Sequence, residues 1–345
     1  MTTLTSGMTS FAYGAQHLGM LLPATMVQRV VRFVGRVEAP LPNGVEQSEL
    51  NRRLRALFDR DLKNVEEGLY PRRLLFQMPV AAYAKSLPRL ALELPRSWRR
   101  RQKEAWRELP DEVDTKLYPP YFRRTFHWQT DGYLSRRSAE LYDVGVEFLF
   151  AGTADVMRRQ VIPPISRFLE ERGGAQGRRL LDVACGTGRT LGQIQVAHPA
   201  LKLYGLDLSP YYVQVAREAL DDVAFTAENA ESMPFADATF DVVTSTYLFH
   251  ELPKNARRRV IAEMVRVCKP GGLIVIEDSA QLVEAGPIGF FLERFPQDFH
   301  EPFYRDYMKD DLALPLAEAG LVDVEMQPTF VAKVIWARKP AAAEA

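Results

Sequence analysis

Two aspartates and two glycines carry the clearest chemical signature of this sequence. Residues 180–189 read LLDVACGTGR, so an apolar stretch reaches Asp182 and then passes through Gly186 and Gly188. A glycine lets the backbone approach a ligand closely, because it has no Cβ. An apolar strand, a glycine turn and the start of a helix, in this order, are typical of a nucleotide-like cofactor site.

The spacing within this string favours one kind of cofactor. Leu191 stands where the dinucleotide pattern G-x-G-x-x-G has its third glycine, which weakens a nicotinamide interpretation. Asp182, between strand and turn, suits a cofactor with a charged amine and no pyrophosphate, and S-adenosylmethionine fits that description. Asp207 ends a second apolar stretch about 20 residues past the turn, where a carboxylate can accept both hydroxyls of a ribose.

Titratable side chains near the predicted site are few. Methyl transfer depends mainly on holding nucleophile and methyl in line, but a nucleophile of high pKa still needs a proton acceptor. His250 is the best placed candidate, and Glu251 could orient it; His300 and His127 are weaker candidates. For each histidine the alternative is a hydrogen-bonded structural role. We expect no metal site, because no C-x-x-C or H-x-x-x-H spacing occurs.

These residues require a sheet that brings the carboxyl ends of parallel strands to one crevice. The sequence predicts an α/β fold: a doubly wound, Rossmann-like sheet, mostly parallel with an antiparallel C-terminal hairpin, preceded by an N-terminal α-helical domain. We expect strands at 180–183, 203–208, 224–227, 240–245 and 273–276, helices at 255–268 and 309–319, and a KPGG turn at 269–272.

The motifs together resemble a known family. DVACGTG, Asp207, the string NAESMPF at 229–235 and the KPGG turn, in this order, are similar to the class I S-adenosylmethionine-dependent methyltransferases of the type 11 group. That group includes the ubiquinone and menaquinone C-methyltransferases. The resemblance runs from about residue 141 to about residue 336, and Tyr142-Asp143 and Arg158-Arg159 look like a residue pattern upstream of the cofactor domain in the quinone enzymes.

The resemblance implies a role for particular residues. It places the methionine part of the cofactor at Asp182 and the glycine turn, the ribose at Asp207, and a cofactor wall at Thr246 or Tyr247. By the same resemblance, the adenine is expected to bind at Leu208, Asn229 and Ala230. The full set that we expect to bind the cofactor is Asp182, Ala184, Cys185, Gly186, Thr187, Gly188, Asp207, Leu208, Asn229, Ala230, Thr246, Tyr247, Tyr133 and Tyr142.

Two aromatic segments predict the nature of the methyl acceptor. Residues 126–135 contain His127 and Trp128, and an insertion after the fifth strand, predicted as a lid at 279–308, contains Phe299, Phe303 and Tyr304. We expect these five residues to bind an apolar or aromatic acceptor. The alternative is that they only pack against one another. Residues 246–253 read TYLFHELP and not the Gly-Leu-Arg-Asn type of the quinone enzymes, so the resemblance alone does not identify a quinone precursor as the acceptor.

The predicted function is therefore S-adenosylmethionine-dependent methyl transfer to an oxygen or carbon nucleophile of an apolar or aromatic small molecule, lipid-like, quinone-like or polyketide-like. A nucleic-acid methyltransferase is one alternative, but residues 244–247 lack the Asn or Asp before Pro-Pro-Tyr, and Lys plus Arg and Asp plus Glu both total 44. A non-catalytic binding protein is the other, against which the glycine turn and the ribose acid argue.

The chain divides into three predicted segments: a helical extension at 1–110, a linker and cap at 111–165, and the cofactor domain at 166–340. Prolines at 71, 79, 88 and 95 are expected to end helices. Residues 26–37 suit either a membrane-surface helix or a packed one, and the basic run at 96–107 either binds phosphates or is a solvated face. Two cysteines without a signal peptide suggest the cytoplasm, with peripheral membrane contact and a homodimer left open.

Overall fold

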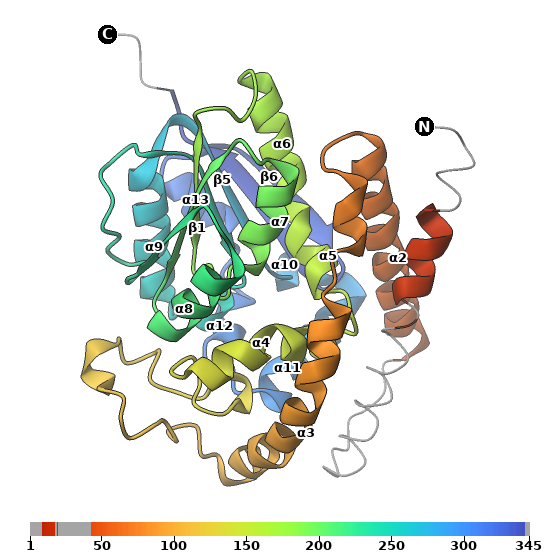
Figure 1. The fold of residues 1–345 in the computed structure, drawn as a ribbon, viewed down its shortest axis with the longest axis vertical. Helices are drawn as coiled ribbons and strands as arrows, with labels where there is room; N and C mark the ends of the chain where they lie inside the picture. The colour runs from red at the N-terminus through yellow and green to blue at the C-terminus, as the bar shows by residue number, and fades with distance from the viewer. Residues whose placement is uncertain (1–8, 18, 20–42, 342–345) are drawn as a thin grey trace.

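The computed structural model describes residues 9–17, 19 and 43–341, and its centre is one twisted sheet with helices on both faces (Figure 1). The sheet has seven strands in the order β3-β2-β1-β4-β5-β7-β6. The first five pair in parallel, and β7 runs antiparallel between β5 and β6. The strands are β1 (Arg179–Val183), β2 (Lys202–Asp207), β3 (Val223–Ala227), β4 (Phe240–Thr246), β5 (Cys268–Ser279), β6 (Val322–Thr329) and β7 (Ala332–Arg338). The predicted doubly wound fold with a C-terminal hairpin is confirmed.

The central strands bury both faces, as parallel strands covered by helices do. Leu180 packs with α6 (Ile162–Glu171), α7 (Arg189–Ala197) and α8 (Pro210–Ala219). The next residue, Leu181, points to the opposite face, which is covered by α9 (Lys254–Val267) and α13 (Ala313–Glu318). This alternation along β1 explains why its sequence is continuously apolar, and it leaves only the strand ends for polar chemistry.

The N-terminal part is helical, as predicted, but two proline stops were wrong. The helices are α2 (Gly44–Glu66), η1 (Arg72–Phe76) and α3 (Val80–Lys103). Pro71 and Pro79 precede η1 and α3, whereas Pro88 and Pro95 lie inside α3. A proline costs a helix one backbone hydrogen bond, yet its fixed φ is helical. Packing of α3 against α4 (Arg136–Leu149), through Tyr83 and Leu90, stabilises the helix across both prolines.

Between these helices and the sheet lies a segment with little regular structure. It contains the short turns η2 (Thr115–Leu117) and η3 (Phe126–Trp128), then α4, α5 (Ala154–Arg158) and η4 (Arg159–Val161). His127, Trp128 and Asp131 all have positive φ values. Such conformations are strained for residues with a Cβ and persist only where surrounding contacts impose them. The strain here occurs next to the cavity described below.

The segment after β5 forms short helices: α10 (Leu282–Ala285), η6 (Gly286–Ile288), α11 (Gly289–Asp298) and α12 (Tyr304–Tyr307). Figure 1 shows α11, α12, α3 and α4 gathered at one end of the sheet, below the carboxyl ends of the parallel strands. The helix expected at 309–319 is shorter than predicted. α13 begins only at Ala313, after the N-cap Leu312; the Asp311 side chain just before it accepts the backbone N–H of Ala313, and Pro315 lies in the first turn.

The predicted KPGG turn differs in the structure, and the predicted helix at residues 26–37 cannot be compared with it. The KPGG turn at 269–272 is not a separate turn before a strand but an irregularity within β5, where the pairing jumps from Cys268 to Leu273. Residues 26–37, the candidate membrane-surface helix, lie outside the described residues. Within the described ranges no helix is both long and apolar enough to cross a bilayer.

The basic run at the end of α3 is neutralised by acids. Arg99 Nη2 lies 2.5 Å from Glu108 Oε2, and Arg101 Nη2 lies 2.8 Å from Asp298 Oδ1. Trp98, within this run, is partly exposed. Trp106 packs against the ring of His300, with 5.6 Å between ring centroids. These ion pairs favour the solvated-face interpretation of the run.

Candidate active site at the carboxyl ends of the strands

The glycine turn after β1 has the conformation that its sequence predicts. Gly186 and Gly188 have φ values of +55° and +79°, in the region that glycine adopts at little cost. A Cβ on Gly188 would stand 2.9 Å from Leu220 Cδ1, so the leucine side chain would have to move, in addition to the strain of a positive φ. The turn leads directly into α7. Because its two glycines have no Cβ, a ligand can approach the backbone there.

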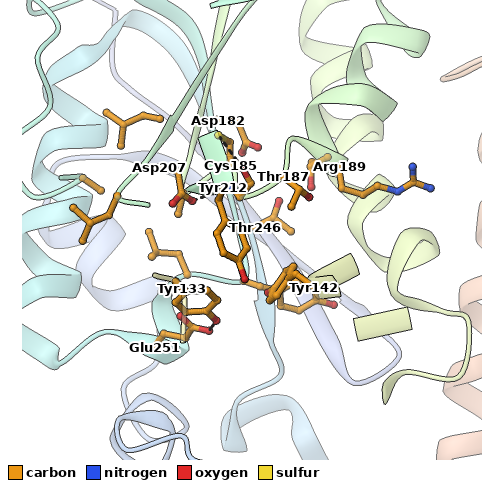
Figure 2. A pocket seen from close by; sticks show the side chains of 18 of the residues that line it. Tyr133, Tyr142, Asp182, Cys185, Thr187, Arg189, Asp207, Tyr212, Thr246 and Glu251 are labelled. Carbon is orange, nitrogen blue, oxygen red and sulfur yellow. Dashed lines mark hydrogen bonds between the residues drawn. The ribbon is translucent and has the colours of Figure 1, made fainter. Parts of the chain in front are cut away.

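The two predicted acids lie on either side of this turn (Figure 2). Asp182 is buried, and Thr244 Oγ1 donates to its Oδ1 at 2.8 Å. Asp207 accepts the backbone N–H groups of Gly186 at 2.9 Å and Ser209 at 2.8 Å. Burial raises the pKa of Asp182 to about 7 and that of Asp207 to about 6. A ligand that donates hydrogen bonds or carries positive charge would stabilise the ionised form of both carboxylates.

A cavity opens at these strand ends, with an empty volume of about 1000 Å³ that includes open space at its mouth. Small-molecule sites span about 300–1,000 Å³, so there is room for a cofactor and an acceptor. Every residue expected to bind the cofactor lines it except Gly188, whose backbone sits within the turn. Glu251, predicted as a catalytic residue, lines it as well.

Several lining residues were not predicted as site residues. Asp143 accepts the hydroxyl of Thr187 at 2.8 Å, and Arg158 stands beside it. The others are Tyr121, Phe122, Phe126, Arg189, Thr190, Leu206, Tyr212, Leu248, Leu252 and Val260. The family resemblance already pointed to Tyr142-Asp143 and Arg158-Arg159. The aromatic residues at 121–126 carry no motif, and only folding of this segment over the strand ends identifies them.

The residues present fit S-adenosylmethionine. Thr246 Oγ1 and Asp143 Oδ1 are buried, and neither makes a hydrogen bond within the described part of the chain. A ligand with its own donors and acceptors would satisfy them. The two aspartates and the open glycine turn offer acceptors for a ribose and contacts for a charged amino acid moiety.

Aromatic rings form the other half of the cavity. The ring of Tyr133 packs edge-to-face on Tyr142 and Tyr212, with centroids 6.0 Å and 5.4 Å apart, and stacks on Phe122 and Phe126. Its hydroxyl donates to Glu251. Figure 2 shows Tyr133, Tyr142 and Glu251 grouped together, away from Asp182. The cavity is thus polar at the strand ends and aromatic opposite them.

The structure places His250 behind the cavity wall. Its Nδ1 lies 2.6 Å from Asp278 Oδ1, so Asp278, and not Glu251 as predicted, contacts the ring. Burial lowers the pKa of His250, but Asp278 outweighs this effect and raises it to about 9. The ring centroid is 6.2 Å from that of Tyr247, a lining residue. A catalytic role for His250 stays a prediction.

The predicted acceptor residues also lie outside the lining of this cavity. His127 contacts Glu251 and Glu301, which belong to a cluster considered below. Tyr304 is buried against Phe295, and Phe299 packs on the same ring. Of the remaining acceptor candidates, Trp128 packs on the ring of His300 and Phe303 packs on Tyr121. His300, predicted as a weaker catalytic candidate, also stacks on Trp106 and does not line the cavity. Their roles in acceptor binding therefore stay predictions.

Comparisons with known proteins agree with this site. A model of the methyltransferase domain matches residues 181–276. A demethylmenaquinone methyltransferase of Geobacillus sp. (strain WCH70) is 31% identical over 175 residues, which cover 44% of this chain and 74% of that protein. O-methyltransferase rstn1 of Aspergillus nomiae is 31% identical over 199 residues, which cover 54% of this chain and 85% of the other.

Two further similarities are more partial. A demethylmenaquinone methyltransferase of Renibacterium salmoninarum is 34% identical over 140 residues, covering 41% of this chain and 54% of that protein, so the chain spans about half of its length. The crystal structure of an S-adenosylmethionine-dependent methyltransferase from Aquifex aeolicus is 24% identical, covers 50% of this chain and 87% of the other, and has a TM-score of 0.38.

Fold and site define a cofactor-binding α/β enzyme of the doubly wound type. The chain belongs to the class I S-adenosylmethionine-dependent methyltransferases, in the type 11 group. The predicted resemblance is confirmed, and S-adenosylmethionine is the cofactor.

Proposed function

We propose that this methyltransferase acts on an oxygen or carbon nucleophile of an apolar, aromatic small molecule. The observation that carries the proposal is the two-sided cavity, with buried acids at the strand ends and stacked tyrosine and phenylalanine rings facing them. Aromatic walls favour flat or apolar ligands, because such surfaces gain most from leaving water.

In this proposal Asp207 holds the ribose and the glycine turn accommodates the methionine part of the cofactor. When bound, the cofactor supplies a methyl group on a positively charged sulfur. The chain contributes position: Thr246 and Tyr247 at the end of β4 form one wall, and Tyr133 and Tyr142 form the opposite one. Holding the nucleophile and the methyl carbon in line while excluding water lowers the barrier by positioning.

A nucleophile that carries a proton must lose it. His250, oriented by Asp278, is the proposed proton acceptor; because its pKa is raised to about 9, only the neutral fraction of the ring can accept the proton, and that fraction grows as pH rises toward 9. The names of the relatives support the acceptor class, since demethylmenaquinone is a quinone and another relative is an O-methyltransferase.

Calorimetry with S-adenosylmethionine and S-adenosylhomocysteine tests the cofactor half of the proposal. We expect both to bind the purified chain, and Asp207→Ala to weaken binding by about 10–100-fold, because charge-assisted hydrogen bonds to two hydroxyls are lost. Glu325→Gln, on the exposed edge strand β6, is the control. A folded protein that binds neither compound contradicts the proposal.

The acceptor half needs a transfer assay. Cofactor with an isotopically labelled methyl group would be incubated with panels of quinols, phenols and aromatic polyketides, and with a matched panel of polar amines and oligonucleotides. Mass spectrometry of the products then assigns the acceptor. We expect label only in the aromatic panels; label in oligonucleotides or in polar amines alone would overturn the proposed acceptor class.

A further inference from the structure

Three side chains from distant parts of the sequence meet beside the cavity. His127 comes from η3, Glu251 from η5 (Phe249–Glu251), and Glu301 from the segment between α11 and α12. His127 Nε2 lies 3.3 Å from Glu251 Oε1 and 3.0 Å from Glu301 Oε1. One ligand atom from each residue lies within 4.8 Å of the others. Each of these side chains can coordinate a metal through the atom that faces the other two.

Glu301 is the observation that points to a ligand. Its side chain has no exposed surface, and neither carboxylate oxygen finds a well-aligned hydrogen-bond donor among the described residues. A buried carboxylate without donors is costly, because it has lost its hydration without replacement. Among the described residues, the cationic candidate in direct contact with Glu301 is the ring of His127. A cation between the two glutamates would supply the partner that Glu301 lacks.

The spacing matches that of a metal site. At a metal–ligand distance of about 2.1 Å, two ligands at right angles stand about 3.0 Å apart. The two measured separations from His127 Nε2, 3.0 Å and 3.3 Å, agree with this value. We propose that His127, Glu251 and Glu301 bind one divalent transition-metal ion next to the cofactor cavity.

The ligand types select among metals. One imidazole nitrogen and two carboxylates suit zinc, manganese or iron(II), whereas calcium and magnesium prefer oxygen ligands throughout. Three protein ligands leave coordination positions for water or for another oxygen, as in metal sites that take part in reactions. Tyr133, whose hydroxyl donates to Glu251, would orient that ligand from outside, which is the usual role of second neighbours at metal sites.

The site borders the acceptor end of the cavity. Glu251 and Tyr133 both line the cavity (Figure 2). Glu251 also faces His127, which lies outside the lining. The left-handed backbone at His127 and Trp128 aims the imidazole at the two glutamates. Metal binding at this cluster is independent of the proposed function, because it can be measured without any methyl transfer. The competing arrangement without a metal is a protonated His127 shared by the two carboxylates.

The test uses the full chain, freed of affinity tags and dialysed against a chelator. Manganese(II) is titrated at pH 7.5 and free ion is counted by electron paramagnetic resonance, with zinc as a competitor. We expect one ion per chain with a dissociation constant in the micromolar range or tighter. Binding of S-adenosylhomocysteine, measured on the same samples, reports separately on the cofactor site.

Glu301→Gln and His127→Asn are expected to weaken manganese binding at least 100-fold while circular dichroism stays that of the folded protein. Two matched controls are expected to bind normally: Glu325→Gln on β6 and His198→Asn, a histidine that contacts Ser166 far from the cluster. Should either variant fail to fold, electron spin echo spectra of the wild-type complex decide, because coordination by one imidazole gives a nitrogen-14 modulation.

A folded wild-type chain that binds no manganese or zinc overturns the proposal in favour of the protonated histidine. So does binding that survives both substitutions, or a bound ion without nitrogen modulation. None of these results bears on the methyltransferase activity, which has its own assay.

Discussion

At the scale of single residues, the unusual feature is a pair of acids, Asp182 buried and Asp207 half-buried, that have no basic partner at hydrogen-bond distance among the described residues. Within that part of the chain, Asp182 and Asp207 receive hydrogen bonds from a hydroxyl and from backbone N–H groups. Their negative charges are therefore poorly compensated until a ligand arrives. Such groups are costly to the empty protein and useful to the bound one.

This cost has a pH dependence. Burial raises the pKa of Asp182 to about 7 in the folded protein, against about 3.9 in an unfolded chain. The folded state then binds more protons than the unfolded state between about pH 4 and pH 7, so the stability of the ligand-free protein falls as pH rises through that window. Above pH 7 the loss is complete.

Asp182→Asn removes the titrating carboxyl, so it should remove this pH dependence of stability. For the ligand-free protein at pH 8, we expect the free energy of unfolding of the variant to exceed that of the wild type by about 1–4 kcal/mol. At pH 4.5 we expect the two free energies of unfolding to be nearly equal. Urea unfolding at both pH values measures the difference, and calorimetry should show weaker cofactor binding. A stability difference that does not change with pH would contradict the argument.

His250 allows a second prediction at this scale. We expect His250→Ala to lower kcat by about 100-fold or more, because a positioned proton acceptor contributes about 10²–10⁴ to a rate. Cofactor affinity should change less than twofold, since His250 does not line the cavity. Steady-state kinetics and calorimetry check the two parts. Unchanged kcat would leave positioning as the sole catalytic device and remove His250 from the mechanism.

At the scale of elements, the turn between β1 and α7 depends on glycine for two separable reasons. Gly188 combines a φ of +79° with a Cβ position only 2.9 Å from Leu220. Gly177 has a similar φ of +75° but open space around it. We expect Gly177→Ala to cost about 1 kcal/mol from backbone strain alone.

Gly188→Ala should cost more, about 2–4 kcal/mol, since overpacking adds to strain, and it should weaken cofactor binding at least tenfold. Thermal and urea unfolding of the two variants measure the stability part, and calorimetry measures the binding part. Equal costs for the two substitutions would show that crowding at Leu220 is relieved by a small shift.

The elements also show where sequence patterns suffice. The strands near the cofactor are continuous apolar runs that end in acids, and all five expected parallel strands are present, with α9 (Lys254–Val267) within one residue of its prediction. The prediction that Pro88 and Pro95 end helices was wrong, because packing of α3 on α4 compensates for the backbone hydrogen bonds that the prolines cannot make. The cluster of His127, Glu251 and Glu301 could not be read from spacing, because 124 residues separate its first two members.

At the scale of the whole molecule, a buried ion pair joins the N-terminal helix α2 to η4, which leads into α6 against the sheet. Arg159 Nε, next to α6, donates to Asp61 Oδ1 of α2 at 2.7 Å, and Tyr13 and Tyr70 donate to the same carboxylate. Asp61 and Arg159 are both almost fully buried. Breaking such a pair leaves an uncompensated charge in the interior.

We therefore expect Asp61→Asn to lower the free energy of unfolding by about 3–5 kcal/mol. Arg52→Met, which removes the pair between an exposed arginine and Glu49, should change the stability far less. Urea unfolding followed by circular dichroism and by tryptophan fluorescence measures both. Coincident curves would show that the helices and the sheet unfold together; an unchanged stability in Asp61→Asn would contradict the structural role of the pair.

The cavity is assembled from two stretches of chain that lie far apart in sequence. Its acids belong to β1 and β2, while its stacked rings belong largely to residues 121–142. Under the proposed function, mutations of Phe122 and Phe126 in the second stretch should alter what is methylated more than they alter Asp182, Asp207 and the glycine turn. Descendants of one ancestor that vary at such ring positions would diverge in substrate while keeping the two acids and the turn that receive the methyl donor, and chimaeras that exchange this stretch but keep Tyr133 and Tyr142 offer a direct route to new specificities.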